Sequence, residues 1–241
     1  MRGSLGARLE PASGLSVRVT LLRLLDACDA VSAPYPHEAA SQAGFDVLQV
    51  ADPAGSGGRA LVAWDGSGAL VVAIRGSGAE TRRDVLMNVQ DDAFAVPVHP
   101  GDALPGLPGG ARVHAGFLRH WLSLRDAVLE EVARAPHAAL AVTGFSLGGA
   151  CAVLAAAALR ERGPSVVAFG APRVGNGVFA GWFRQAVPDC RRVVLPGDLV
   201  PLVPPHPYIH VPSLLRLPRS GPDLRPEHDR GEYRKALSTI E

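Results

Sequence analysis

The sequence lacks the charge bias that marks proteins binding nucleic acids or anionic membrane surfaces. Its 24 lysine and arginine residues are matched by 23 aspartate and glutamate residues, so the formal net charge at pH 7 is only +1. Because such binding depends on clustered positive charge, this balance argues against nucleic acid as the main partner. Lysine itself is nearly absent, since Lys235 is the only one.

Cysteine is also scarce, with only Cys28, Cys151 and Cys190. These residues form no C-x-x-C pair and have no metal-ligand spacing, and an odd number cannot all pair within one chain. We therefore expect three small buried apolar side chains, with Cys151 inside a helix. The sequence predicts neither a bound metal nor a cofactor.

Long apolar runs are missing as well. The most apolar N-terminal segment, residues 16–29, is interrupted by Arg18, Arg23 and Asp26. It is too short for a membrane-spanning helix and lacks the continuous apolar stretch of a signal peptide. The sequence therefore predicts a cytoplasmic protein, or a secreted one if a signal segment has been removed.

The apolar residues that are present suffice for a sizeable core. Hydrophobic residues make up 47% of the 241 residues. Residues 1–15 are expected to be flexible, and residues 16–241 are expected to form one α/β domain. Strands are expected at 46–51, 60–65, 69–74, 138–143, 165–169 and 191–195, and helices at 17–31, 116–134, 149–159, 176–187 and 230–238. This alternation predicts a mostly parallel sheet with helices on both faces and an antiparallel edge.

The most informative segment is Gly144-Phe-Ser-Leu-Gly148, which lies between an apolar strand pattern and a run of small helix formers. A G-x-S-x-G sequence in this context is typical of the nucleophile elbow of an α/β-hydrolase. Glycines avoid clashes around the strained turn, and the start of the helix directs backbone N–H groups toward the serine. Ser146 is therefore the candidate nucleophile.

A serine nucleophile needs a histidine base and a carboxylate, which follow it in that fold in the order serine, acid, histidine. Asp198 follows the strand expected at 191–195, at the end of the sheet where such sites form. Asp189 precedes that strand, and Asp223 and Asp229 lie in loops without such an anchor. Asp198 is therefore the candidate acid.

Three histidines, His206, His210 and His228, follow Asp198. The first two flank a proline-rich segment within 12 residues of Asp198, and a histidine in such a segment can equally well be a loop or packing residue. His228 lies just before the last expected helix, where a loop can bring it back over the sheet. Chain order and placement favour His228, with His210 as the alternative.

Ester hydrolysis through a serine also needs two donors for the oxyanion that forms on the substrate. One is the backbone N–H of Leu147, the residue directly after the nucleophile. The other must come from a turn after an earlier strand, and Ile74-Arg-Gly-Ser77 supplies one. Gly76 permits the turn, and Ser77 offers both an N–H and a hydroxyl.

Six segments between residues 70 and 237 together resemble, in order, the motifs of the class 3 lipase family, the fungal-type triacylglycerol lipases and their bacterial relatives. They are Val71-Val-Ala-Ile-Arg-Gly-Ser77, Val113-His-Ala-Gly-Phe117, Val142-Thr-Gly-Phe-Ser-Leu-Gly-Gly-Ala150, Phe169-Gly-Ala-Pro-Arg-Val-Gly-Asn176, Arg192-Val-Val-Leu-Pro-Gly-Asp-Leu-Val-Pro201, and His228 followed by Tyr233. The first 60 residues match only loosely.

The resemblance implies an α/β-hydrolase fold with a short lid segment. It also implies a triad and two oxyanion donors at the positions already singled out: Ser146, Asp198 and His228, with Ser77 and Leu147 as donors. His114 would have a structural role at a helix start. Neither a metal nor a cofactor is implied.

Two segments depart from the family pattern. Phe145 replaces the histidine that usually precedes the nucleophile. The lid usually begins with an Asp-Trp pair, whereas residues 79–88 contain no tryptophan and carry four charges beside Val85, Leu86 and Met87. Val85, Leu86 and Phe145 are the expected lid and substrate contacts.

The sequence thus predicts a serine ester hydrolase that acts on acylglycerols or similar lipid esters, with transient lipid contact through the lid. A phospholipase A1 or a polyester depolymerase is the alternative within the same chemistry. The substrate pocket distinguishes these enzymes, and its shape depends on loops 79–112 and 199–228, whose conformation the sequence does not predict. A catalytically silent lipid-binding module on the same fold is the alternative from another class. The intact triad residues argue against that last possibility.

The composition of residues 79–88 predicts weak interfacial activation. A lid opens by exchanging apolar contact with the protein for apolar contact with lipid, and this segment has little apolar surface to exchange. The rate of p-nitrophenyl butyrate hydrolysis should rise smoothly as the ester concentration passes its solubility limit. A sharp jump in rate at that limit would contradict the prediction.

Overall fold

The computed structural model describes residues 20–53, 58–77, 97–211, 213–218 and 228–240. Residues 1–15, expected to be flexible, and the expected lid residues Val85 and Leu86 lie outside the described residues. Within these ranges, no helix has both the length and the apolar character needed to cross a bilayer.

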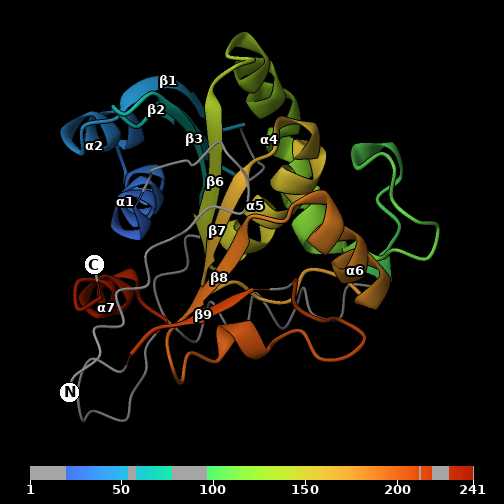
Figure 1. Ribbon diagram of the computed structural model, residues 1–241. Coiled ribbons are helices and arrows are strands. Elements are labelled where there is room, and N and C mark those ends of the chain that lie inside the picture. The colour runs from blue at the N-terminus through green and yellow to red at the C-terminus, as the bar shows by residue number, and fades with distance from the viewer. Residues whose placement is uncertain (1–19, 54–57, 78–96, 212, 219–227, 241) are drawn as a thin grey trace, which may run out of the picture.

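A seven-stranded sheet forms the centre of the described part of the chain, in the order β1-β2-β3-β6-β7-β8-β9 (Figure 1). The first three strands pair antiparallel, and every pairing from β3 to β9 is parallel. The mostly parallel sheet with an antiparallel edge is therefore confirmed. The strands are β1 (Asp46–Ala51), β2 (Ala60–Trp64), β3 (Ala69–Ile74), β6 (Ala139–Phe145), β7 (Ser165–Phe169), β8 (Cys190–Val194) and β9 (Leu214–Arg216).

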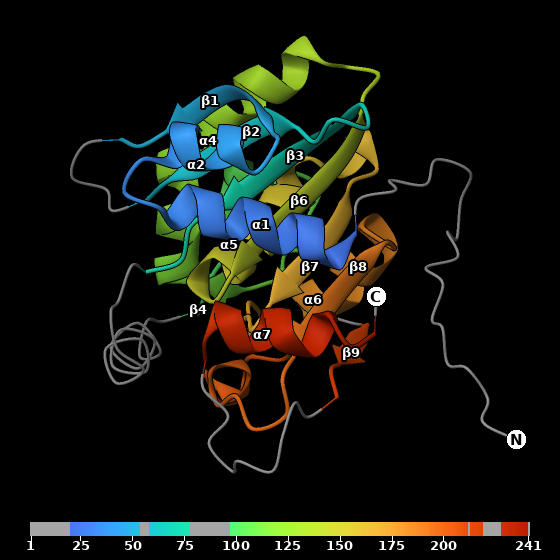
Figure 2. The same ribbon diagram turned by 90° about the vertical axis from the view of Figure 1, so that its left-hand side faces the viewer.

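Helices cover both faces of this sheet. Figure 1 shows α4 (Ala115–Arg134), α5 (Leu147–Ala158) and α6 (Gly177–Ala186) on one face. Figure 2 shows α1 (Leu21–Ser32), α2 (Pro36–Gln42) and α7 (Arg230–Leu237) on the other. Two buried apolar clusters correspond to these two faces, so the sheet separates two cores.

Several short elements differ from the sequence prediction. The Pro34-Tyr-Pro36 segment was expected only to end the first helix, but Pro36 begins α2, because proline is well suited to the first helical position. β9 has three residues and extends the parallel sheet beside β8. The expected loop 91–112 contains β4 (Pro97–Val98), which pairs with β5 (Val113–His114), and a one-turn helix at Gly101–Ala103. Two further one-turn helices form later in the chain, at Arg160–Arg162 and Val200–Leu202.

The turn from β6 into α5 requires glycine because backbone segments meet there. A Cβ on Gly144 would lie 2.2 Å from the carbonyl oxygen of Gly148. A Cβ on Gly148 would lie 2.1 Å from the carbonyl oxygen of Ile74, at the end of β3. No side chain fits within such distances, so β3, β6 and α5 approach through their backbones. This approach fixes the position of Ser146 between them.

Gly148→Ala should therefore lower the free energy of unfolding by about 2–3 kcal/mol, the usual cost of forcing extra atoms into a packed interior. Urea denaturation followed by circular dichroism would measure it. Gly181→Ala in α6 is the matched control, because a Cβ there meets nothing within 4 Å. That replacement should stabilise by about 0.5–1 kcal/mol. Equal effects at the two positions would contradict the packing argument.

Candidate active site

Ser146 lies at the junction of β6 and α5 in a conformation that residues with a side chain rarely adopt. Its φ is 61° and its ψ is −128°. Among the described non-glycine residues, only Ser213 shares a positive φ. The Ser146 N–H donates to the carbonyl oxygen of Phe169 at 2.9 Å, which ties the turn to β7. A strained turn held in this way is a mark of a functional position.

Asp198 lies in the turn that follows β8, as expected from its place after that strand. Its N–H donates to the carbonyl oxygen of Leu195 at 3.1 Å, and Gly197 provides a φ of 91°. The residue is only 4% exposed. Its Oδ1 accepts the N–H of Val200 at 3.0 Å. A buried carboxylate is tolerated only where its oxygens are hydrogen-bonded, and the other oxygen is also bonded.

His228 lies directly before α7, and its side chain is 2% exposed. Its Nδ1 is 2.7 Å from Oδ2 of Asp198. An ionised carboxylate can only accept, so a neutral imidazole in this pair carries its proton on Nδ1. Nε2 is then the basic nitrogen of the ring. The structure therefore joins two of the predicted residues, Asp198 and His228, in one hydrogen bond.

Gly170 is the position around which these groups gather. A Cβ there would lie 2.9 Å from Cε1 of His228 and 3.1 Å from Oδ2 of Asp198. Gly170 follows Phe169, whose carbonyl oxygen accepts the N–H of Ser146. The absence of a side chain at residue 170 thus lets the imidazole approach the serine turn.

Phe145 makes the direct contact between the serine turn and the imidazole. Its ring centroid lies 4.6 Å from that of His228, at an interplanar angle of 31°. Phe145 is buried on the α1 and α7 side of the sheet. Its expected contact with substrate stays a prediction, whereas its packing against His228 is observed.

Two buried polar atoms at this site stand out. Ser146 Oγ and His228 Nε2 have no hydrogen-bond partner among the described residues. Buried polar atoms are normally bonded, so an exception calls for an explanation, and a catalytic role is one such explanation. A hydroxyl and a basic nitrogen in this state, in residues that pack around the same turn, are suited to nucleophilic chemistry.

The backbone around the serine turn defines the surroundings of the two expected oxyanion donors, Leu147 and Ser77. Leu147 is the first residue of α5, so its N–H has no acceptor within the helix. Gly76 approaches the turn from β3, since a Cβ there would lie 3.0 Å from the carbonyl oxygen of Phe145 and 3.6 Å from Cβ of Ser146. Ser77, the next residue, is half-buried.

The alternative histidines lie in other surroundings. Nε2 of His210 is 2.6 Å from the carbonyl oxygen of Pro201. Burial, together with the charge of Arg192, lowers the pKa of His210 to about 4. His206 is exposed. His114 has the expected structural role, because its Nδ1 accepts the N–H of Phe117 at the start of α4.

Tyr233 completes the polar cluster, although its sequence pattern predicts no role for it beyond its place in a motif. Its hydroxyl donates to Oδ2 of Asp198 at 2.7 Å. Burial and the neighbouring carboxylate raise the pKa of the Tyr233 phenol, so it remains a donor. The signal in the sequence that could have indicated this hydrogen bond is that Tyr233 follows His228 by five residues, in the first turn of the short helix α7.

The cysteines take no part in this site. All three are buried thiols that form no disulfide, as expected for small apolar fillers. Burial raises the pKa of the Cys28 and Cys190 thiols to about 12, which keeps them protonated and unreactive.

Comparison with known sequences gives a consistent result. The family model described as "Lipase (class 3)" matches residues 71–208. The chain is 36% identical over 142 residues to secreted mono- and diacylglycerol lipase 1 of Fusarium solani, which covers 56% of this chain and 39% of that protein. It is 38% identical over 152 residues to secreted mono- and diacylglycerol lipase A of Penicillium cyclopium, covering 59% of this chain and 46% of that protein. The chain thus matches less than half the length of these relatives.

Solved structures of similar fold are also lipases. One is a triacylglycerol lipase whose catalytic centre is described as a serine protease triad; the TM-score is 0.67 at 26% identity, over 81% of this chain and 77% of that one. Another is the native complex of Rhizomucor miehei lipase with its propeptide, with a TM-score of 0.67 at 25% identity, over 81% of this chain and 66% of that one.

The hydroxyl of Tyr233 should stabilise the buried carboxylate. Tyr233→Phe keeps the ring and its edge-on contact with Phe145 and removes only the donor. The free energy of unfolding should fall by about 1.5–3 kcal/mol, as for a lost hydrogen bond to a charged group. Urea denaturation would measure the change, with Tyr35→Phe as a control at an exposed tyrosine. A loss no larger than that of the control would disprove the role.

Proposed function

Because the chain belongs to the class 3 lipase family and has the α/β-hydrolase fold, we propose that it is a serine ester hydrolase. The observation that carries this proposal is the pair of buried, unbonded atoms, Ser146 Oγ and His228 Nε2, beside the hydrogen bond from His228 to Asp198. A strained serine, an oriented imidazole and a buried carboxylate form the combination that nucleophilic acyl transfer requires.

In the proposed first step, Ser146 Oγ attacks the ester carbonyl carbon while Nε2 of His228 takes the hydroxyl proton. The N–H of Leu147 and the N–H or hydroxyl of Ser77 stabilise the tetrahedral oxyanion. As the oxyanion collapses, the C–O bond to the alcohol breaks, and His228 returns the proton to the leaving oxygen. The acyl group then remains on Ser146.

In the second step, water takes the place of the alcohol. His228 removes a proton from the water as it attacks the acyl-enzyme carbonyl, and the same donors stabilise the second oxyanion. On collapse the bond between the acyl carbon and Ser146 Oγ breaks, and His228 returns the proton to Oγ, which releases the carboxylic acid and restores the serine hydroxyl. Asp198 keeps the imidazole in one tautomer and stabilises its positive charge in both steps. The residues of the chain thus suffice for every proton transfer.

We further infer that the substrates are acylglycerols or similar lipid esters, with transient contact to a lipid surface. Support comes from the relatives, which are named mono- and diacylglycerol lipases. Their names also describe them as secreted, which favours export of this protein over the cytoplasmic location expected from its sequence.

The proposal predicts that a fluorophosphonate labels the protein with one equivalent per chain at Ser146. Ser146→Ala should abolish labelling and lower the rate of ester hydrolysis at least about 10⁴-fold, to the level of background. Circular dichroism should be unchanged, because only one oxygen is removed.

Ser41→Ala, at an exposed serine of α2, is the control and should be labelled like the unaltered protein. Activity that persists in Ser146→Ala would refute the assignment of the nucleophile. A protein that binds lipid but neither reacts with the label nor hydrolyses esters would instead be a catalytically silent binding module.

A further inference from the structure

The histidine of the site precedes a helix that cannot hold itself in place. α7 has eight residues, and isolated helices of that length are not stable in water. His228 lies two residues before its first residue, Arg230. The contacts that fix the first turn of α7 therefore also fix the backbone from which the imidazole extends.

Apolar burial holds only the later part of α7. Tyr233, Ala236 and Leu237 are its buried residues, and they belong to the apolar cluster that includes α1. At its start, the Asp229 side chain accepts the N–H of Glu232, which stabilises the helix but does not attach it to anything. His228 and Tyr233 also bond to Asp198, and the further attachment of the first turn comes from other side chains.

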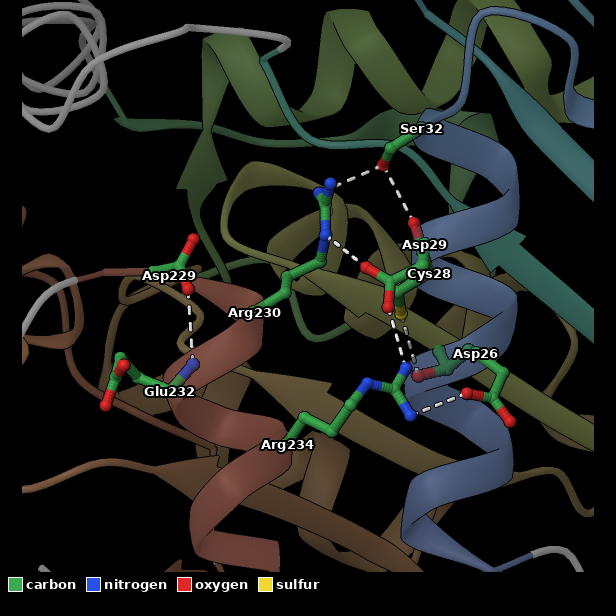
Figure 3. Close-up of polar contacts among 9 residues, drawn as sticks. Asp26, Cys28, Asp29, Ser32, Asp229, Arg230, Glu232 and Arg234 are labelled. Atoms are coloured by element: carbon green, nitrogen blue, oxygen red, sulfur yellow. Dashed lines mark hydrogen bonds and ion pairs between the residues drawn. The ribbon is translucent and has the colours of Figure 1, made fainter. Parts of the chain in front are cut away.

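Charged side chains supply this attachment, as Figure 3 shows. Nε of Arg230 lies 2.5 Å from Oδ1 of Asp29, and Nη2 of Arg234 lies 2.7 Å from Oδ2 of the same residue. One carboxylate of α1 thus bridges two arginines of α7. Arg234 also pairs with Asp26, with 2.7 Å between Nη1 and Oδ1. The acidic residues are three apart and the arginines four apart, so each pair shares one helix face.

Arg230 links this pairing to the site itself. Its Nη1 donates to the hydroxyl of Ser32 at 3.1 Å, at the end of α1, where a positive charge is favourable to the helix dipole. Its guanidinium carbon lies 5.8 Å from the centroid of the Phe145 ring. That ring packs against His228 at 4.6 Å. Arg230 therefore contacts both α1 and the ring that supports the imidazole.

We name these side chains the α1–α7 charge network: Asp26, Asp29 and Ser32 of α1 with Arg230 and Arg234 of α7. We propose that this network keeps His228 within reach of Ser146, with Arg230 as a positioning residue. The inference rests on the proposed hydrolase function, because it assigns the network an effect on the proton transfer of that reaction.

The exposure of the network indicates that its effect is on geometry more than on stability. The acidic and arginine side chains are 33–41% exposed, and ion pairs of this kind stabilise a fold little. Proton transfer is far more sensitive, since a displacement of about 1 Å can lower a rate about 100-fold. A weak restraint on the first turn of α7 is therefore enough to change the rate.

Asp29→Asn and Arg230→Gln test the proposal, since each breaks the pairing while preserving most of the side-chain volume. Each should lower kcat for p-nitrophenyl butyrate about three- to tenfold and leave KM within about twofold, because the change affects proton transfer rather than ester binding. Arg230→Lys keeps the charge but not the forked geometry, and it should recover part of the rate.

Labelling by a fluorophosphonate separates positioning from folding. In both variants the final stoichiometry should remain one per chain, while the labelling rate falls by the same factor as kcat. Raising the salt concentration from 0.05 to 1 M screens exposed pairs, so it should slow the unaltered protein more than Asp29→Asn.

Glu232→Gln is the matched control. It also removes a charge from α7, but the ion-pair partner of Glu232 is Lys235, which lies on α7 itself rather than on α1. It should leave kcat and the labelling rate unchanged. Rates in Asp29→Asn and Arg230→Gln equal to that of the control would overturn the proposal. So would a loss of stoichiometry in parallel with rate, which would make the network a requirement for folding alone.

The Arg230→Gln and Arg230→Lys pair gives the same decision if Asp29→Asn does not fold, because both replace the same side chain and only the lysine retains its positive charge. Failure of the proposed function has a different signature. In that case the unaltered protein itself would not be labelled, and both proposals would fall together.

Discussion

The backbone contact between β3, β6 and α5 is the constraint on which the site depends. With no Cβ at Gly144 or Gly148, the helix begins directly against the strands, and Ser146 is forced into a left-handed φ. The strain is local, whereas the packing that maintains it extends through the apolar cluster around α4 and α5. A serine held by backbone in this way keeps its hydroxyl at the carboxyl edge of the sheet without help from its own side-chain contacts.

The carboxylate of Asp198 imposes a second requirement, because a buried charge must be bonded on both oxygens. Its three donors come from different parts of the chain: the N–H of Val200 in the same turn, and the side chains of His228 and Tyr233 beside or within α7. Only the first is local. The acid therefore helps to hold α7 against the sheet while it orients the imidazole, so structural and chemical roles share one group.

The sequence predicted those parts of the molecule whose signals are local. The elbow glycines, the apolar run of β3 and the turn after β8 each fit one place in a parallel sheet, and their order predicted the fold and the candidate residues. α2 was missed because Pro36 indicates either the end or the start of a helix. β9 was missed because three residues at a sheet edge carry no periodicity. The pairing of Asp29 with Arg234 was beyond prediction, since 205 positions separate these residues and neither belongs to a motif.

The proposed nucleophile and the proposed base are consequently held by different kinds of interaction. Ser146 is fixed by the close backbone contacts at Gly144 and Gly148. His228 depends on one hydrogen bond to Asp198, on the Phe145 ring and on a short helix attached through exposed ion pairs. Interactions of the second kind are weak and screened by salt, so they permit small displacements of the imidazole at little cost in stability. The base has to accept a proton from one oxygen and return it to another in each step of the proposed reaction. Loosening of α7 therefore disturbs the proposed proton transfers before it costs the fold much stability.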